Sequence, residues 1–237
     1  KLSDYTPYPF LIPNISIDFN IGKEEVDVLT SMIIEPKIKG SSKLVLKGSY
    51  IKLVSISIDD KELDSNEFNI YEHELIILTT PSSKFKLNIK SKIDPFKNTS
   101  LEGLYLSSDI LTTQCEAEGF RRISYHPDRP DVLSKYSVRI EADRFLYPVL
   151  LSNGNRKSSA KLNENMDRHE IIWEDPIPKP SYLFALVAGD LVEISDIYIT
   201  NSGRSIDIKL FVEKGDEKYT KHAIQSLKKA MKWDEEK

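Results

Sequence analysis

Much of the chain alternates apolar and polar side chains with a period of two. In residues 15–21, apolar side chains fall at odd positions and polar ones lie between them. Further segments of strand-like character are 54–58, 75–78, 85–89 and 138–142. A period of two is typical of a strand with one buried face, and the continuous apolar run at 75–78 is typical of a strand buried on both faces. The sequence therefore predicts packed β-sheets up to about Asp190.

The pattern changes after Asp190. Two strand-like segments, 194–200 and 206–212, flank the turn-forming residues 201–203 and predict a β-hairpin. Residues 219–233 then show a helical period, with an apolar stripe and lysines on the opposite face. The stripe consists of Ala223, Ile224, Leu227, Ala230 and Met231. We expect a β domain over residues 1–190 and the first elements of a second, truncated domain over 191–237.

Composition narrows the classes of protein that the chain could represent. It has 237 residues, of which 40% are apolar and 30% charged, enough to bury a core. The net charge of −4, with both signs interspersed, argues against a nucleic-acid-binding module, which needs a basic stripe. The longest apolar run, 182–188, is too short to span a bilayer, so we expect no membrane span. The single cysteine favours a reducing compartment, and we expect a cytoplasmic protein.

Two His-Glu pairs, at His73 and His169, imitate the start of the zinc-binding motif His-Glu-x-x-His. That motif needs a second histidine four residues later, on the same face of a helix. Ile77 and Trp173 stand at those positions, and both segments have strand-like character. Since the four histidines are scattered along the chain, the sequence predicts no metal site within it.

Residues 113–131 gather the densest set of candidate functional groups. Cys115 could be a nucleophile only with a base and an orienting partner, and it is more simply a small buried apolar residue. If residues 112–117 form a strand, Gln114 and Glu116, with Glu118 as a further candidate, would share one face, and Cys115 and Ala117 would share the other. A carboxylate beside a carboxamide can hold an ammonium group, by charge and by a further acceptor oxygen. A solvated polar strand face is the plainer interpretation.

The arginines of the same stretch, Arg121, Arg122 and Arg129, could bind an anion. We favour the alternative that they pair with neighbouring carboxylates and hold the loop in place. The candidate partners are Glu116, Glu118, Asp128 and Asp131.

The segment 173–180 carries prolines at alternate positions. It could be a polyproline ligand. We interpret it instead as a rigid lead-in to a buried strand at 182–188, because alternate prolines preclude regular strand pairing.

Several blocks of this sequence occur in order in one protein family. The blocks are TQCEAEGFRR at 113–122, DRPD at 128–131, YPVLLSNGN at 147–155 and PKPSYLFALVAGD at 178–190. They resemble the N-terminal domain of zinc aminopeptidases of the aminopeptidase N family, in particular the bacterial-type alanyl aminopeptidases, a branch also found in protozoan parasites. Two later blocks, SGR at 202–204 and SLKKAMKWDEE at 226–236, resemble the start of that family's thermolysin-like catalytic domain. Residues 1–100 match only in their strand-rich character.

The resemblance implies a saddle-shaped, multi-sheet, β-sandwich-like N-terminal domain, then a β-hairpin and one helix that begin a truncated thermolysin-like domain. It implies a zinc metalloaminopeptidase that acts on peptides with a free N-terminus, and whose catalytic and C-terminal domains are partners of this one. The family's Gly-Ala-Met-Glu-Asn and His-Glu-x-x-His motifs do not occur here. By this resemblance the zinc ligands and all catalytic residues lie outside the chain, which would be inactive alone. The chain also starts without methionine, and we expect a piece of a longer protein.

By the same resemblance, Gln114 and Glu116 project into the active-site cleft and help to hold the substrate's α-ammonium. Many mammalian members carry glutamine where Glu116 stands. A fixed acidic anchor lets an aminopeptidase distinguish a chain terminus from an internal peptide, and it places the first carbonyl against the zinc. His126 and Ser181 depart from residues common in the family, and we interpret them as scaffold variation.

A stand-alone β-sandwich interaction module without catalysis is the alternative from another class. It explains the absence of metal ligands equally well. The downstream reading frame separates the two hypotheses, because only the enzyme continues into Gly-Ala-Met-Glu-Asn and His-Glu-x-x-His.

Overall fold

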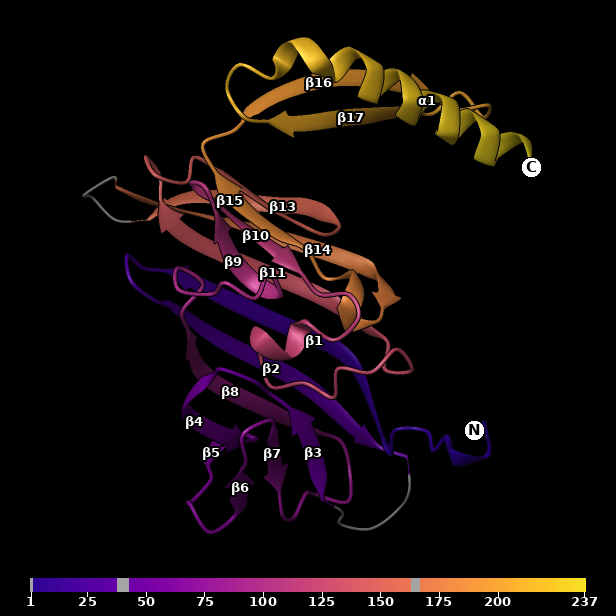
Figure 1. Ribbon diagram of the computed structural model, residues 1–237. Coiled ribbons are helices and arrows are strands. Elements are labelled where there is room, and N and C mark those ends of the chain that lie inside the picture. The colour runs from indigo at the N-terminus through magenta and orange to yellow at the C-terminus, as the bar shows by residue number, and fades with distance from the viewer. Residues whose placement is uncertain (1, 38–42, 163–166) are drawn as a thin grey trace. The chain divides into compact units, whose positions relative to one another are not determined.

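The computed structural model describes residues 2–37, 43–162 and 167–237. The chain divides into two compact units, Lys1–Gly189 and Asp190–Lys237. The first holds three β-sheets with short 3-10 helices, and the second holds a two-stranded sheet and an α-helix (Figure 1). The prediction of a mainly β fold with several sheets, followed by a hairpin and one helix, is confirmed.

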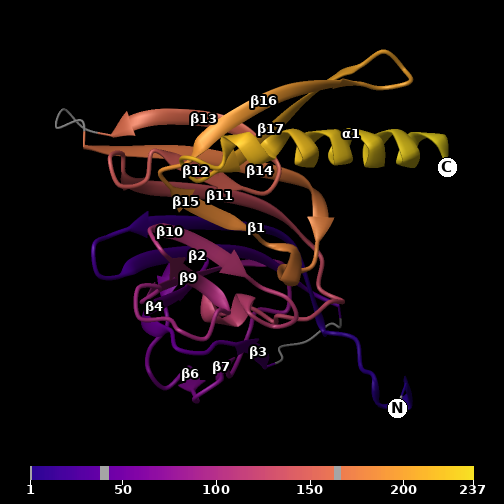
Figure 2. The same cartoon turned by 45° about the horizontal axis from the view of Figure 1, so that its top comes forward.

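An eight-stranded sheet spans the first unit, in the order β13-β14-β11-β1-β2-β8-β4-β5. Its strands are β1 (Phe10–Ile21), β2 (Val26–Pro36), β4 (Lys52–Ile58), β5 (Lys61–Glu62), β8 (Phe85–Ile93), β11 (Ser134–Asp143), β13 (Asn155–Leu162) and β14 (Arg168–Lys179). Most of these strands can be followed in this order down the first view, and a turned view shows the same succession from β13 to β2 (Figures 1 and 2). The central pair, β1 and β11, is parallel, and every other pair in this sheet is antiparallel.

Two smaller sheets complete the first unit. One has the order β12-β15-β10-β9, and the other has the order β3-β7-β6. Their strands are β3 (Leu44–Lys47), β6 (Phe68–Ile70), β7 (Glu74–Ile77), β9 (Gly103–Ser107), β10 (Ile110–Gln114), β12 (Val149–Ser152) and β15 (Leu186–Gly189). The 3-10 helices are η1 (Leu2–Asp4), η2 (Phe120–Arg122) and η3 (Ser181–Leu183).

The three sheets of the first unit share one hydrophobic core. On β1, Ile15, Ile17 and Phe19 are buried, whereas Ser16 and Asn20 are exposed. The alternation read from the sequence therefore places one face of the eight-stranded sheet against the core. Burial of such apolar side chains, at about 25 cal/mol per Å², is the main stabilising contribution to a fold of this kind.

Aromatic side chains fasten η2 and the segment after η3 to that core. Phe120 of η2 lies edge-to-face against Phe184 at 5.3 Å between ring centroids. Phe120 also contacts Tyr136 of β11 at 6.3 Å, and Phe184 stacks on Phe19 of β1 at 6.1 Å. These contacts fix the 113–131 region relative to the centre of the large sheet.

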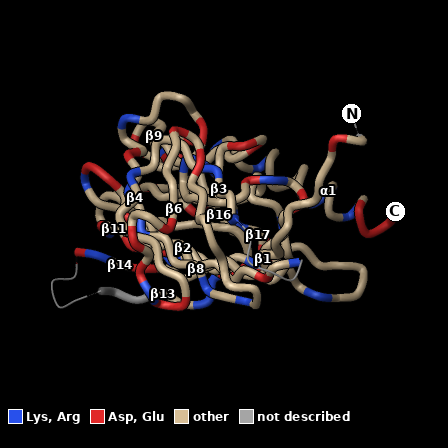
Figure 3. Tube along the Cα trace, turned by 90° about the horizontal axis from the view of Figure 1, so that it is seen from below, with Lys and Arg blue, Asp and Glu red and all other residues tan. Residues whose placement is uncertain are grey.

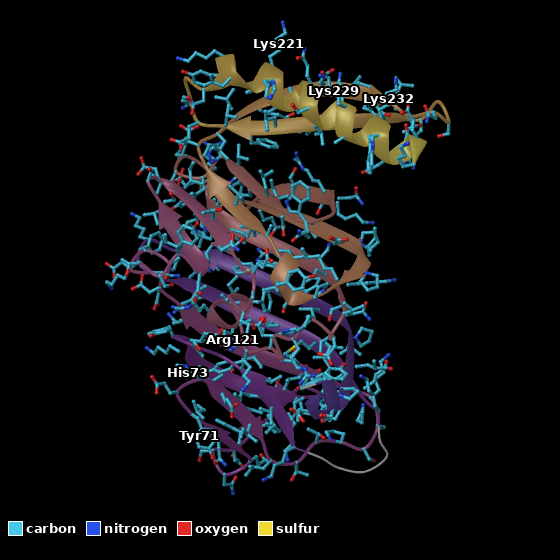
Figure 4. The ribbon with its side chains drawn as sticks, turned by 45° about the vertical axis from the view of Figure 1, so that its right-hand side comes forward. Tyr71, His73, Arg121, Lys221, Lys229 and Lys232 are labelled. Atoms are coloured by element: carbon cyan, nitrogen blue, oxygen red, sulfur yellow. The ribbon has the colours of Figure 1, made fainter. Side chains whose placement is uncertain are left out.

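The second unit contains β16 (Val192–Ile199), β17 (Ser205–Val212), η4 (Glu217–Tyr219) and α1 (Thr220–Glu236). The predicted hairpin is confirmed, and Gly203 turns the chain with φ +81°. Lys221 projects from α1 on the side away from the two strands (Figure 4). Of the predicted apolar stripe on α1, Ile224 is buried, whereas 47% of Leu227 is exposed.

The structure differs from the sequence-based expectations in three segments. Residues 173–180 lie mostly within β14, which pairs with β11 up to Lys179 opposite Ser134. The prolines are tolerated because the register shifts there: Asp175 still pairs with Tyr136, and the residues between Asp175 and Lys179 have no partner in the β11 register.

The predicted buried strand at 182–188 is shorter than expected. Its first part is η3, where 49% of Leu183 is exposed, and only Leu186–Gly189 forms a strand, β15. The predicted strand over 112–117 likewise stops early, because β10 ends at Gln114.

Acidic and basic residues are interspersed along the trace, as Figure 3 shows. Within the described residues, no helix is long and apolar enough to cross a membrane. The expected cytoplasmic location and the expected lack of a nucleic-acid partner stay predictions.

Candidate substrate-anchoring site

Gln114 and Glu116 lie together at the end of strand β10. The side chains of both are exposed, and Cys115 between them is buried. The Gln114 side-chain amide donates a hydrogen bond from Nε2 to the main-chain oxygen of Glu116, at 3.2 Å. The peptide bond between Glu116 and Ala117 is cis. The exposure of Gln114 and Glu116 and the burial of Cys115 agree with the predicted alternation, whereas Ala117, expected on the face of Cys115, is exposed because the strand ends at Gln114.

Strand β10 pairs with β9 through Gln114 and with β15 through Leu111 and Thr112. Gln114 lies opposite Gly103 of β9, and Thr112 lies opposite Val187 of β15. The hydroxyl of Thr113 also accepts a hydrogen bond from the main-chain amide of Leu186, at 2.9 Å. A side chain at the end of such a strand has a well-defined position, which favours its use as an anchor.

The chain folds back on itself immediately after Glu116. The main-chain amide of Gly119 donates to the oxygen of Cys115 at 2.8 Å. A Cβ atom on Gly119 would lie 2.4 Å from the main-chain oxygen of Gln114 and 3.0 Å from the Cα of Cys115. Because φ at Gly119 is −81°, this close approach, and not the backbone conformation, requires glycine here.

Each of the three arginines pairs with a carboxylate. Arg121 contacts Asp128 at 2.9 Å and Glu118 at 3.2 Å, measured between side-chain nitrogen and oxygen. Arg129 contacts Asp131 at 2.7 Å. The prediction that these arginines hold the loop by ion pairing is confirmed for both residues.

The partner of Arg122 was not among the predicted carboxylates. Arg122 contacts Glu102 at 3.2 Å, just before β9. Its guanidinium also lies over the ring of Tyr50, with the central carbon 4.4 Å from the ring centroid.

The buried carboxylate of Asp128 accepts hydrogen bonds from two of the 3-10 helices, η2 and η3. Its Oδ2 accepts from the main-chain amide of Arg121 at 3.2 Å and from Nε of the same residue at 2.9 Å. Its Oδ1 accepts from the hydroxyl of Ser181 at 2.8 Å. Sequence reasoning missed this role of Ser181, and the block DRPD at 128–131 was the signal that pointed to Asp128.

Asp131 holds the N-terminal segment. The carboxylate accepts from the hydroxyl of Tyr5 at 2.9 Å and from the main-chain amide of Tyr8 at 3.2 Å. Arg129 donates from Nη2 to the main-chain oxygen of Thr6 at 2.8 Å. The hydrogen bond from Arg129 holds the pKa of the Asp131 carboxyl well below its usual range. The two aspartates of the DRPD block thus fasten different parts of the chain.

Cys115 and His126 are buried beside this network. Burial raises the pKa of the Cys115 thiol to about 12, so the thiol stays protonated at neutral pH and lacks nucleophilic character. Burial lowers the pKa of His126 to about 4, so its ring is neutral. The ring packs edge-to-face on Phe120 at 5.1 Å. These features support the interpretation of both residues as scaffold.

The other histidines singled out from the sequence have local contacts of their own. Nε2 of His169 is hydrogen-bonded to the main-chain oxygen of Tyr147 at 2.8 Å, and Nδ1 of His73 lies 3.1 Å from the hydroxyl of Ser49. Among the residues that the structure describes, no group of three or more His, Cys, Asp or Glu side chains could hold a metal ion.

The structure thus defines a multi-sheet β domain in which an exposed amide and an exposed carboxylate lie at and just beyond the end of β10. The family comparison agrees with this fold. Residues 12–183 match the sequence model of the Peptidase M1 N-terminal domain. The chain belongs to this family.

Similar proteins span the whole chain. It is 47% identical to "Aminopeptidase N" of Caulobacter vibrioides over 236 residues, which are 100% of this chain and 27% of that protein. It is 42% identical to "Aminopeptidase N" of Escherichia coli K12, over 99% of this chain and 26% of that protein. The chain therefore spans about a quarter of the length of these relatives.

Solved structures agree on the fold. Legionella pneumophila aminopeptidase A, solved in complex with aspartic acid, matches 100% of this chain and 28% of its own with a TM-score of 0.93 and 36% identity. An M1 zinc metallopeptidase from Deinococcus radiodurans matches 93% of this chain and 52% of its own with a TM-score of 0.75. At 11% identity, that second match shows the fold alone.

Proposed function

We propose that this chain is the N-terminal part of a zinc aminopeptidase, and that Gln114 and Glu116 hold the α-ammonium group of the peptide substrate. The observation that carries the proposal is the exposed carboxamide at the end of β10 and the exposed carboxylate two residues beyond it. Its support in sequence is the 47% identity to an aminopeptidase N along the whole chain.

The chemistry of the pair suits an ammonium ligand. The Glu116 carboxylate supplies a full negative charge, and charge-assisted hydrogen bonds are about twice as strong as neutral ones. The Gln114 side chain donates through Nε2 to the main-chain oxygen of Glu116, which leaves its side-chain oxygen available to accept from the ligand. An internal peptide nitrogen is uncharged, so this pair would favour a free N-terminus.

We propose that the zinc of the enzyme is held outside the residues that the structure describes. The described residues do not fit a zinc site, because they offer no cluster of three potential ligands. The zinc ligands and the catalytic groups would therefore come from residues outside the chain. What these residues can contribute is to bind the substrate terminus and orient it.

The surface of the second unit supports further protein packing against it. Its hairpin and helix leave large apolar side chains exposed, namely Ile197 (52%), Ile199 (59%), Leu227 (47%) and Trp233 (60%). A two-stranded hairpin is marginally stable in water without further packing. We propose that the rest of a catalytic domain covers these residues.

The proposal is tested in the full-length enzyme with Glu116→Ala. We expect kcat/KM for an aminoacyl-anilide to fall about 10- to 100-fold, chiefly through KM, because a charged hydrogen bond to the ligand is lost. Glu116→Gln, which keeps the shape but not the charge, should give a smaller loss. An unchanged kcat/KM in Glu116→Ala would remove this residue from the site.

The 237-residue chain by itself provides a second test. We expect it to bind no stoichiometric zinc and to hydrolyse no aminoacyl-anilide, because catalytic groups would have to come from elsewhere. Zinc-dependent turnover by the isolated chain would contradict this division of roles.

A further inference from the structure

We propose that Asp128 is a positioning residue for the ammonium anchor, a role that rests on the proposed function of Glu116. Asp128 is too deeply buried to touch a substrate, since only 1% of its side chain is exposed. It would act through Arg121, which lies in η2, directly after the segment that carries Glu116.

The first step is the attachment of Arg121. Its main-chain amide and its guanidinium both donate to Oδ2 of Asp128, so backbone and side chain are held by one oxygen atom. The other carboxylate oxygen is held by Ser181 of η3. Figure 4 marks Arg121 in the ribbon of the first unit. Asp128 therefore fixes η2 relative to η3 from between them.

The second step connects Arg121 to Glu116. The exposed residues 116–118 form a short bridge between two fixed ends, Gln114 in β10 and the glycine turn that leads into η2. Gly119 bonds back to Cys115, and the amide of Arg122 donates to the oxygen of Gly119 at 3.0 Å. A displacement of η2 would therefore move the far end of the bridge on which Glu116 stands.

The third step concerns the positive charge of Arg121, which connects Asp128 to the carboxylates near Glu116. The guanidinium of Arg121 is shared between the buried carboxylate of Asp128 and the exposed one of Glu118. Without the negative charge of Asp128, the Arg121 guanidinium would pair with the remaining carboxylates of residues 116–118, including that of Glu116. It would then compete with the substrate ammonium for the same group.

The backbone at Asp128 allows a clean substitution. Its φ is +50°, in the left-handed region that asparagine and aspartate adopt more readily than other residues apart from glycine. Asp128→Asn keeps the shape and this backbone preference. It removes the charge and replaces one of the two acceptor oxygens by a donor, so Ser181 can bond only by accepting and the bond to Arg121 loses its charged acceptor.

The experiment compares four forms of the full-length enzyme with the wild type: Asp128→Asn, Glu116→Ala, the double variant and Asp131→Asn. We expect Asp128→Asn to raise KM for an aminoacyl-anilide about tenfold, with a smaller change in kcat. The double variant should match Glu116→Ala alone, because a positioning effect has nothing left to act through. Asp131→Asn is the control, since this neighbouring carboxylate holds the N-terminal segment instead, and its kcat/KM should stay at the wild-type value.

The outcomes distinguish the two proposals. An unchanged kcat/KM in Glu116→Ala overturns the anchor itself. A strong effect of Glu116→Ala together with wild-type kinetics in Asp128→Asn, or with losses that multiply in the double variant, overturns only the positioning role. If Asp128→Asn does not fold, Ser181→Ala takes its place: it removes one donor to Asp128, and its smaller rise in KM should likewise vanish in the Glu116→Ala background.

Discussion

The main-chain amide of Asp128 donates a hydrogen bond to Nδ1 of the buried His126 ring, at 2.9 Å. The neutral ring accepts this bond, whereas a protonated ring would place a second donor opposite the amide. Together with the burial that lowers the pKa of His126 to about 4, this contact makes the ring a source of pH-dependent stability.

We predict that the chain loses stability between pH 7 and pH 4. The ordinary pKa of histidine, 6.5, lies above the folded value, so in this window the unfolded state binds a proton that the folded state does not. The stabilisation is complete above pH 6.5 and falls as pH decreases, by about 3 kcal/mol in total for this group. Urea unfolding at pH 7.5, 6, 5 and 4.5 measures the free energy of unfolding.

The matched variant for this prediction is His126→Asn, whose side-chain oxygen can accept from the Asp128 amide without titrating. It should be less stable than the wild type at pH 7.5 and show a shallower slope between pH 6.5 and 4.5. An equal slope in both proteins would assign the pH dependence to other groups.

Gly119→Ala should destabilise the first unit by about 2 kcal/mol or more, because the new Cβ would lie 2.4 Å from a main-chain oxygen that cannot move without disturbing β10. Gly189→Ala is the control in the same sheet, where the nearest atom, at 3.1 Å, belongs to the flexible side chain of Ile110. The loss of stability in Gly189→Ala should be smaller than in Gly119→Ala. Thermal unfolding of the two variants and the wild type measures these losses of stability. Equal stability of Gly119→Ala and wild type would refute the close approach at Gly119.

The Cys115 thiol should resist a disulfide reagent such as dithiobis-nitrobenzoate in the folded chain at pH 8. Its pKa of about 12 leaves almost no thiolate, and only 3% of the residue is exposed. The urea-unfolded chain provides the control and should react completely within minutes. Rapid labelling of the folded chain at one thiol per molecule would show that Cys115 is reactive after all.

The sequence located strands through segments in which apolar and polar side chains alternate without interruption. Alternation at 15–21 and 85–89 lies within β1 and β8 as observed. Strand β2 was missed, because a polar residue interrupts its buried face: Thr30 is 1% exposed, and its hydroxyl lies 2.6 Å from that of Ser124. A buried threonine that is satisfied by a distant serine cannot be recognised from periodicity.

The candidate site was predictable only in part, for a similar reason. The spacing predicted that Gln114 and Glu116 share one side and Cys115 the other, but it also placed Ala117 with Cys115, and Ala117 is exposed. The contact between Asp128 and Ser181 joins residues that are 53 positions apart, and nothing in the local sequence of either residue indicates the other. Such long-range polar contacts depend on the arrangement of η2 and η3, which the sequence did not predict.

The parallel pairing of β1 with β11 has a consequence for synthesis on the ribosome. Asn14 lies opposite Lys135, so one edge of β1 has to wait for a partner that is translated more than a hundred residues later. At about 5–20 residues per second this delay is on the order of ten seconds. Until then one edge of the twelve-residue strand β1 lacks its native partner, and an unpaired edge of this kind is one to which another copy can add. We therefore expect the interval before β11 is synthesised to be the stage at which this edge is most open to association.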